Sequence, residues 1–239
     1  MEFKEFSNKV NKWDQKFILK YNGLGGKPII IILRVISFFG RETIWLLLIA
    51  FYIFIWYDPF LLSNISAVFL TGLILILVTK QIVKRKRPFE KLKESEITVF
   101  ERKPTSRSFP SWHSYNIMAY GLLFGLILTK SPIIYILLFF LIPLVSFSRI
   151  HLGVHYPTDV IFGCIFGIIG FLLTLYLTGP LIFKIIIYLE QFIMYEIQYQ
   201  GINPMLFSNI GYLLLSISIF FSIILLAFNK RVIEVFIKK

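Results

Sequence analysis

The sequence predicts an all-α membrane protein, a polytopic bundle of about six transmembrane helices. Hydrophobic residues make up 57% of the 239 residues, and the mean hydropathy is +0.76. Soluble domains contain roughly 45–50% apolar residues. The excess is gathered into long blocks, which is the pattern of helices that cross a bilayer. Short connections separate the blocks, so we expect one membrane domain, 28–239, after a separate N-terminal segment, 1–27.

The N-terminal segment predicts an amphipathic helix that lies in the headgroup region. Charged residues occur throughout it and an apolar core is missing, which argues against a cleavable secretion signal. Apolar residues recur at helical spacing and lysines avoid that stripe. The apolar stripe consists of Phe3, Phe6, Val10, Trp13 and Phe17, and the lysines are Lys4, Lys9, Lys12, Lys16 and Lys20.

Six blocks are predicted to span the membrane. They are Thr43–Tyr57, Leu61–Thr79, Ser114–Thr129, Pro132–Ser148, Val160–Thr178 and Leu206–Phe228. Two other stretches are ambiguous. Pro28–Phe39 is apolar but contains Arg34 and is too short to cross alone. Leu181–Tyr199 carries three charged residues, which favour an interfacial helix over a span.

Charge is excluded from the interiors of these blocks, which contain no Asp, Glu, Lys, Arg or His. Channels and ion-coupled transporters keep ionisable groups near mid-membrane, so the pattern favours chemistry at the membrane surface. The net charge of +12 comes from basic residues beside the blocks, which indicates anionic lipid headgroups and not nucleic acid as the counter-charge. Cys164 is the single cysteine and predicts a small buried hydrophobe.

The first polar segment of interest lies in the basic loop 80–113, which has ten Lys or Arg against four Glu. If the preceding span continues as a helix, Lys80 and Arg87 lie on one face, two turns apart, and Pro88 ends the helix. Arg can bind a phosphate with two hydrogen bonds and Lys adds a point charge. Taken alone, the pair is more commonly a basic cluster that anchors a helix at the membrane surface.

The second segment is Pro110-Ser111-Trp112-His113, just before the third predicted span. The first turn of a helix leaves backbone N–H groups unpaired, and these form an anion site. Ser111 can add a hydroxyl and His113 can carry a proton. An N-cap followed by an interfacial Trp is an equally good interpretation of this segment alone.

The third segment joins the fourth and fifth predicted spans and contains Arg149, His155 and Asp159. Asp159 follows His155 by four residues, close enough to accept a hydrogen bond from one ring nitrogen. The other nitrogen is then available as a nucleophile, as in catalytic triads. Arg149 supplies another cation nearby.

A metal site competes with this interpretation, because His151, His155 and Asp159 are spaced four residues apart. Gly153 and Pro157 interrupt the helix that such a site needs, and cations crowd the same face. We therefore expect no metal.

In chain order the three segments read Lys, six residues, Arg-Pro; then Pro-Ser-x-His; then Ser-Arg, five residues, His, three residues, Asp. This pattern resembles the type 2 phosphatidic acid phosphatase superfamily over about 80 residues, from Lys80 to Asp159. The resemblance implies an integral membrane lipid phosphatase that forms a phosphohistidine, without metal or cofactor. Its partners would be the bilayer and a phosphorylated lipid. A lipid-to-lipid phosphotransferase and a non-catalytic lipid-binding or transport protein remain as alternatives.

The resemblance also implies residue roles. His155 would attack phosphorus, Asp159 would hold the reactive tautomer, and His113 would protonate the leaving oxygen. The phosphate oxygens would be surrounded by Lys80, Arg87, Ser111 and Arg149. Trp112 stands where the family pattern has Gly, and we expect it to shape the mouth of the pocket.

Helix packing is predicted by two pairs of glycines spaced four residues apart. Gly121 and Gly125 lie on the third span, and Gly163 and Gly167 on the fifth. Such pairs let helices approach closely, so we expect the two spans to pack together and to bring His113 beside His155.

Two arguments from the sequence predict opposite membrane sides for the site. With an inside N-terminus and six spans, loop 80–113 and the tail Lys230–Lys239 fall on the cytoplasmic side, as the positive-inside rule favours. The resemblance implies a site that faces the periplasm or the outside of a cell membrane. We favour the outside, because phosphate binding already explains the cations of the loop.

Overall fold

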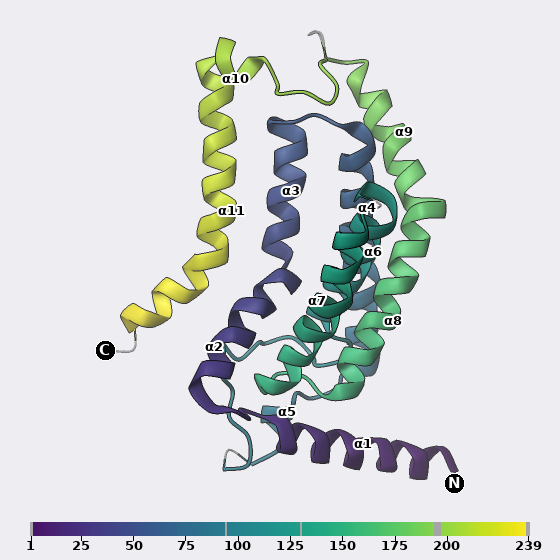
Figure 1. The fold of residues 1–239 in the computed structure, drawn as a ribbon, viewed down its shortest axis with the longest axis vertical. Coiled ribbons are helices and arrows are strands. Elements are labelled where there is room, and N and C mark those ends of the chain that lie inside the picture. Colours follow the sequence, from purple (N-terminus) through teal and green to yellow (C-terminus); the bar gives the residue numbers. More distant parts are fainter. Residues whose placement is uncertain (1, 94, 130, 194–196, 238–239) are drawn as a thin grey trace. The chain divides into compact units, whose positions relative to one another are not determined.

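The computed structural model describes residues 2–93, 95–129, 131–193 and 197–237, and the described chain is largely helical (Figure 1). Contacts divide the chain into a first unit, Met1–Arg41 with Leu70–Leu172, and a second unit, Glu42–Phe69 with Leu173–Lys239. All residues predicted for the site lie in the first unit.

The α-helices follow one another with short breaks. Their bounds are α1 Glu2–Tyr21, α2 Gly26–Ile36, α3 Glu42–Phe54, α4 Pro59–Val83, α5 Pro88–Lys91, α6 Trp112–Leu122, α7 Pro132–His151, α8 Pro157–Leu173, α9 Gly179–Glu190, α10 Met205–Ser208 and α11 Ile210–Ile237. A 3₁₀ turn, η1, covers Ser37–Gly40, and π-helical turns η2 and η3 cover Leu123–Thr129 and Thr174–Thr178.

Three of these helices are long and apolar enough to cross a membrane among the described residues. They are Pro59–Lys91, which joins α4 to α5 across the break after Val83, Pro132–His151 and Pro157–Glu190, while Glu42–Phe54 and Ile210–Leu226 are shorter apolar helices. The count of six spans is therefore not confirmed. The third predicted span is helix α6 continued by η2.

The two ambiguous stretches differ in outcome. Pro28–Phe39 forms α2 and η1, and Arg34 donates to the backbone oxygen of Phe100, which explains an arginine in an apolar stretch. The prediction of a separate interfacial helix at Leu181–Tyr199 is wrong for its helical part, because α8, η3 and α9 form one continuous helix that ends at Glu190. Residues 194–196 lie outside the described part of the chain.

In the second unit, one of the three charges that suggested an interfacial position, that of Glu190, is satisfied locally. The hydroxyl groups of Tyr57 and Tyr199 each donate to the carboxylate of Glu190 at 2.5 Å. A charged residue at this helix end therefore needs no contact with lipid headgroups.

Helix α1 meets the rest of the first unit at a sharp bend, 117° between Lys4–Tyr21 and Gly26–Gly40. Asp14 and Ile18 are fully buried, whereas Phe6 and Trp13 of the predicted lipid-facing stripe are 65% and 45% exposed. The helix thus has one face on the protein and an aromatic face directed outward. Its position in the headgroup region stays a prediction, and the side chain of Phe3 lies outside the described residues.

The two glycine pairs face different neighbours. A Cβ on Gly163 would lie 2.6 Å from the backbone oxygen of Ser111, and one on Gly167 would lie 2.7 Å from Met118 Cβ. Helix α8 therefore packs closely against α6, as predicted.

The other pair does not take part in this contact. A Cβ on Gly121 would lie 3.2 Å from Ile142 Cδ1, and one on Gly125 would lie 3.0 Å from Leu138 Cδ1, both on α7. The prediction that the two glycine faces meet is wrong, because a glycine pair indicates a close helix contact without identifying the partner helix.

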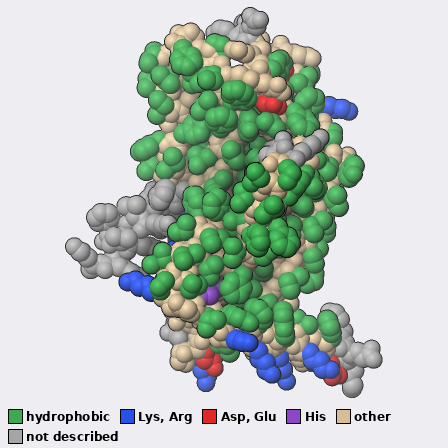
Figure 2. All heavy atoms as spheres, viewed as in Figure 1, with side chains coloured by type: hydrophobic (Ala, Val, Ile, Leu, Met, Phe, Trp, Pro, Cys, Tyr) green, Lys and Arg blue, Asp and Glu red, His purple; other side chains and the backbone are tan. Residues whose placement is uncertain are grey.

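Lys and Arg side chains gather at the end of the first unit where α1 lies, whereas hydrophobic side chains cover the helices (Figure 2). A buried apolar cluster of Ile18, Ile97, Ile150, Tyr156 and Val160 joins α1 to the connection between α7 and α8. This cluster supports the polar site described next.

Candidate active site

His155 stands in the turn between α7 and α8, which is fixed by backbone contacts. Gly153 has φ +81°, and a Cβ there would lie 2.6 Å from the backbone oxygen of Thr98, so only glycine fits. The backbone N–H groups of Val154 and His155 both donate to the carbonyl of Arg149 at 3.2 Å. The position of His155 is therefore set by the main chain.

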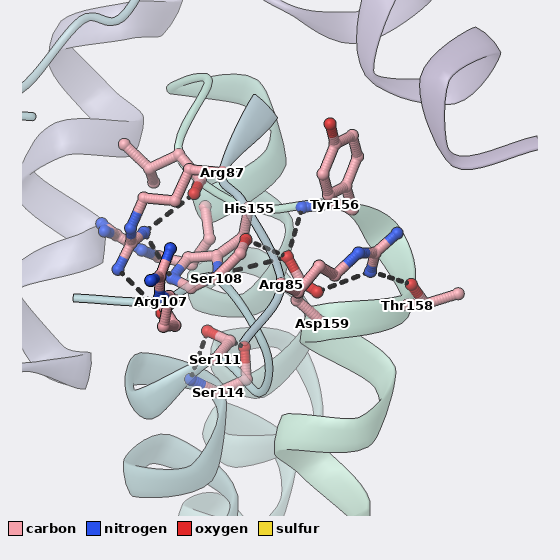
Figure 3. A network of polar contacts seen from close by, with 12 residues as sticks. Arg85, Arg87, Arg107, Ser108, Ser111, Ser114, His155, Tyr156, Thr158 and Asp159 are labelled. Carbon is pink, nitrogen blue, oxygen red and sulfur yellow. Dashed lines mark hydrogen bonds and ion pairs between the residues drawn. The ribbon is translucent and has the colours of Figure 1, made fainter. Parts of the chain in front are cut away.

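The carboxylate of Asp159 faces the ring of His155. Asp159 Oδ2 lies 3.5 Å from His155 Nδ1, longer than an ordinary hydrogen bond. The same oxygen accepts from the backbone N–H of Tyr156 at 2.9 Å and from the Ser108 hydroxyl at 2.5 Å (Figure 3). Such contacts are often long in unliganded active sites and shorten when substrate binds.

The other ring nitrogen of His155 faces a cation. Arg87 Nη1 lies 3.2 Å from His155 Nε2. A guanidinium can only donate, so Nε2 carries the lone pair and the neutral ring holds its proton on Nδ1, toward Asp159. Burial, together with the charges of Arg87, Lys80 and Arg149, holds the pKa of His155 well below its ordinary value. The ring is therefore neutral at pH 7.

Three predicted phosphate ligands are buried around this ring. Lys80, Arg87 and Arg149 are 8%, 3% and 2% exposed. The expected helical path between the first two is wrong, because α4 ends at Val83 and Lys84 has φ +50°. The chain then turns, and Arg87 caps the short helix α5. The cations converge through this turn and not along one helix face.

Two of the cations donate to the loop before α6. Arg87 Nε donates to the backbone oxygen of Ser106 at 2.7 Å, and Lys80 Nζ donates to that of Arg107. Arg87 also donates to the backbone oxygen of Val154 at 2.9 Å. The loop carbonyls thus occupy positions that the oxygens of an anionic group could take.

Arg149 is held by an acidic residue that the sequence analysis did not identify. Both guanidinium nitrogens of Arg149 pair with the carboxylate of Glu101, and Nη1 also donates to the Ser37 hydroxyl at 2.6 Å. A carboxylate presents two oxygens to the guanidinium, as a phosphate does. Glu101 is the one acidic residue in the second half of the basic loop 80–113. That isolated position was the sign in the sequence that it pairs with a cation.

Ser111 and Trp112 form the start of α6. Ser111 is the N-cap, its hydroxyl accepts from the backbone N–H of Ser114 at 3.3 Å, and its own N–H donates to the backbone oxygen of Asp159 at 2.9 Å. The ring of Trp112 stacks on Tyr115 with centroids 5.5 Å apart. The N-cap interpretation holds for the structure, and the anion contact of Ser111 stays a prediction.

His113 lies in the first turn of α6 and packs against Gly40, where a Cβ would come within 2.9 Å of His113 Cβ. Its ring is close enough to Arg149, Arg41 and His155 for their charges to act on it. That the two imidazoles from distant segments act on one phosphate stays a prediction.

His151 lies apart from the other two histidines. Its Nε2 is 2.8 Å from the backbone oxygen of Leu24, in the turn after α1. The described residues contain no group of three or more His, Cys, Asp or Glu side chains that could hold a metal ion.

Arg85 and Asp14 are the principal contacts that the sequence analysis missed. Arg85 Nη1 donates to Asp159 Oδ1 at 2.6 Å, and Arg85 Nη2 donates to Asp14 Oδ2 at 2.5 Å. Arg85 stands two residues before Arg87, and Asp14 is the one acidic residue between Glu5 and Glu42. Its isolation among lysines was the available signal.

The family model of the PAP2 superfamily matches residues 56–182. The chain belongs to the PAP2 superfamily. This PAP2 match includes every residue predicted for the site.

Two relatives share part of this PAP2 chain. An undecaprenyl-diphosphatase of Sulfolobus acidocaldarius is 32% identical over 132 residues, which are 55% of this chain and 62% of the relative. A decaprenylphosphoryl-5-phosphoribose phosphatase of Mycobacterium tuberculosis is 36% identical over 102 residues, 43% of this chain and 52% of the relative. The chain therefore spans less than two thirds of the length of either relative.

Two solved structures resemble the fold. LpxE of Aquifex aeolicus has a TM-score of 0.58 at 20% identity, over 67% of this chain and 93% of that protein. A membrane phosphatidylglycerolphosphate phosphatase of Bacillus subtilis has a TM-score of 0.52 at 26% identity, over 79% and 90%. The first likeness concerns the fold alone.

Proposed function

We propose that this PAP2 protein removes phosphate from a phosphate monoester or pyrophosphate of a lipid, with His155 as nucleophile. One observation carries the proposal: His155 Nε2 lies 3.2 Å from Arg87 among buried cations, while Nδ1 faces Asp159. A neutral imidazole in this tautomer is a nucleophile whose positive charge, once formed, is stabilised by the carboxylate behind it.

The reaction proceeds by two in-line displacements. In the first, a bond forms between His155 Nε2 and phosphorus, and the bond from phosphorus to the lipid oxygen breaks. His113, which takes up a proton when the anionic phosphate binds beside it, gives that proton to the leaving oxygen. In the second, water loses a proton to His113 and attacks phosphorus, the bond to Nε2 breaks, and phosphate leaves.

Charge compensation comes from the protein itself. Lys80, Arg87 and Arg149 surround the place where negative charge spreads over the phosphate oxygens in the transition state. Ser111 adds its hydroxyl at the start of α6, and Trp112 lines the approach. When phosphate binds, it displaces three groups from these cations. They are the backbone carbonyls of Ser106 and Arg107 and the carboxylate of Glu101.

The names of the relatives suggest which substrate to test first. Both sequence relatives are named for polyprenyl lipids, whereas the Bacillus subtilis protein is named for phosphatidylglycerolphosphate. Polyprenyl diphosphate is therefore the first substrate, followed by phosphatidylglycerolphosphate, phosphatidic acid and lipid A.

The proposed location is the cell membrane, with the site on the outer face. The site lies at the end of the first unit where Lys and Arg gather, which suits an anionic headgroup at the membrane surface. Several cations of loop 80–113 are engaged inside the protein and so contribute little to orientation by the positive-inside rule.

Phosphate release from detergent-purified protein tests the function. The wild type is expected to release phosphate from one of the four lipids, and His155→Ala is expected to abolish release. His113→Ala should lower the rate by about 10²–10⁴-fold, the contribution of general acid catalysis. Normal turnover by His155→Ala would refute the mechanism, and radiolabelled phosphate found on a second lipid would identify a phosphotransferase.

A further inference from the structure

Asp159 has a partner that belongs to neither the nucleophile nor the phosphate site. Arg85 lies between two buried carboxylates, Asp159 and Asp14, and donates to each through a different nitrogen (Figure 3). Both carboxylates are 0% exposed, and the Arg85 side chain is 18% exposed. Buried charges are costly unless they are paired, so this arrangement is a strong constraint on all three side chains.

Helix α1 supplies the far end of this chain of contacts. Asp14 also accepts from the backbone N–H of Thr158 at 3.0 Å and from its hydroxyl at 2.6 Å. Thr158 stands next to Asp159 in the first turn of α8, and Arg85 Nη1 bonds its hydroxyl at 2.7 Å. Asp14 therefore holds both Arg85 and the helix turn that carries Asp159.

We propose that Asp14 and Arg85 are positioning residues for catalysis: they orient the Asp159 carboxylate and preserve its negative charge for His155, so that helix α1 completes the active site. This inference rests on the proposed function, because it assigns a purpose to contacts of the proposed catalytic carboxylate.

The hydrogen bonds explain how Arg85 orients the carboxylate of Asp159. Arg85 engages Oδ1 of Asp159, which leaves Oδ2 toward Nδ1 of His155. The guanidinium is itself fixed, because it lies 4.3 Å from the centre of the Tyr156 ring and bonds Asp14 on its other side. A carboxylate held at one oxygen by a rigid partner cannot rotate away from the imidazole.

The charges of the three groups explain how Asp159 keeps its effect on His155. Arg85 alone would neutralise Asp159 and weaken its attraction for a His155 ring that becomes positive during attack. Asp14 neutralises Arg85 in turn, so the three groups together keep one negative charge. Asp14 and Arg85 thus hold the Asp159 carboxylate in place without cancelling the negative charge that stabilises a positive His155 ring.

A matched set of variants tests the inference. Asp14→Asn keeps the shape of the side chain but removes its charge, Arg85→Lys keeps the charge but loses the two-sided geometry, and Glu5→Gln removes a surface carboxylate that pairs with exposed Lys9 on the same helix. We expect kcat to fall by roughly 10- to 100-fold in the first two, the effect of a displaced catalytic group, and to stay unchanged in the third.

Inorganic phosphate as competitive inhibitor separates positioning from a structural role. Phosphate binds the cations and Ser111, so its inhibition constant should change by less than about twofold in Asp14→Asn and Arg85→Lys while kcat falls. Unchanged kcat, or an equal loss of phosphate affinity and kcat, would overturn the inference. A wild type that releases no phosphate from any lipid would refute the proposed function instead.

A double variant tests the charge argument even where a single variant folds poorly. Arg85→Gln leaves two buried carboxylates without their cation, and adding Asp14→Asn returns the cluster to one negative charge. We expect the double variant to have a higher kcat and a higher thermal midpoint in detergent than Arg85→Gln alone. Additive losses would contradict the electrostatic role.

Discussion

At the scale of single residues, the ionisation of His155 is set by its surroundings. Burial and the cations Arg87, Lys80 and Arg149 lower its pKa, whereas an unfolded histidine titrates near pH 6.5. Below about pH 6.5 the unfolded chain binds a proton that the folded site does not bind, so this group makes the fold less stable as the pH falls. Above that pH its contribution is constant.

The titration of His155 can be measured directly by NMR of the ¹³C-labelled imidazole in detergent. We expect its midpoint below about pH 6.5, and we expect Arg149→Gln to raise it because a neighbouring positive charge is removed. His155→Gln identifies the signal. A midpoint at or above the ordinary value in the wild type would contradict the described electrostatics.

Glu101 competes with substrate for Arg149. Because the carboxylate pairs with both guanidinium nitrogens, a phosphate must displace it. Charge-assisted hydrogen bonds contribute about 1.5–3 kcal/mol, so Glu101→Gln should tighten inhibition by inorganic phosphate by roughly tenfold or more.

The control for this prediction is Glu96→Gln, which removes the same charge from an exposed position in the same loop, where Glu96 accepts from the backbone N–H of Lys93 at 3.1 Å. Its inhibition constant should match that of the wild type. Weaker phosphate inhibition in Glu101→Gln would instead mean that Glu101 holds Arg149 in its binding position.

The sequence identified residues whose chemistry and spacing are both local. His155 and Asp159 are four residues apart, so their nearness could be predicted, whereas the cations were assigned to the site through the family resemblance. Arg85, Asp14 and Glu101 could not, because their partners are 48 to 144 residues away in the chain. Only the fold brings such charges together, and hydropathy patterns do not encode the pairing.

At the scale of elements, the sequence predicted where helices occur better than it predicted where each helix ends and which helix it packs against. The apolar blocks correspond to helices because lipid-facing and buried positions both require apolar residues. The end of α4 at Val83 depends on Lys84 at φ +50°, a conformation that is uncommon for lysine and has no sequence signal. Helix α8 continues through η3 into α9, although Lys184 and Glu190 argue against a continuous span in the sequence.

Packing of α8 on α6 gives a prediction at this scale. A Cβ on Gly163 would lie 2.6 Å from the backbone oxygen of Ser111, and backbone cannot move aside as a flexible side chain can. Gly163→Ala should therefore displace the start of α6, lower stability by about 1–3 kcal/mol, and reduce phosphate release.

Gly121→Ala is the matched control for that substitution. Its Cβ would lie 3.2 Å from the flexible end of Ile142, which can rotate away. The thermal midpoint in detergent and the rate of phosphate release should stay close to those of the wild type. Equal effects of the two substitutions would show that α6 and α8 are not held as tightly as described.

At the scale of the whole molecule, the proposed outer location of the site conflicts with a simple count of charges. Loop 80–113 contains ten Lys or Arg, which would favour the cytoplasmic side. Lys80, Arg85 and Arg87 are engaged by carbonyl or carboxylate oxygens within the protein. The loop therefore presents fewer cations to orient the chain than its sequence suggests.

Cysteine labelling in intact cells tests this orientation. Ser95 is an exposed position in loop 80–113 and Ser131 stands between α6 and α7, so one crossing by α6 with η2 places them on opposite sides. In a Cys164→Ser background, a membrane-impermeant maleimide should label Ser95→Cys directly, and should label Ser131→Cys only after permeabilisation. The reverse pattern would place the site in the cytoplasm, where a lipid on the inner leaflet would become its substrate.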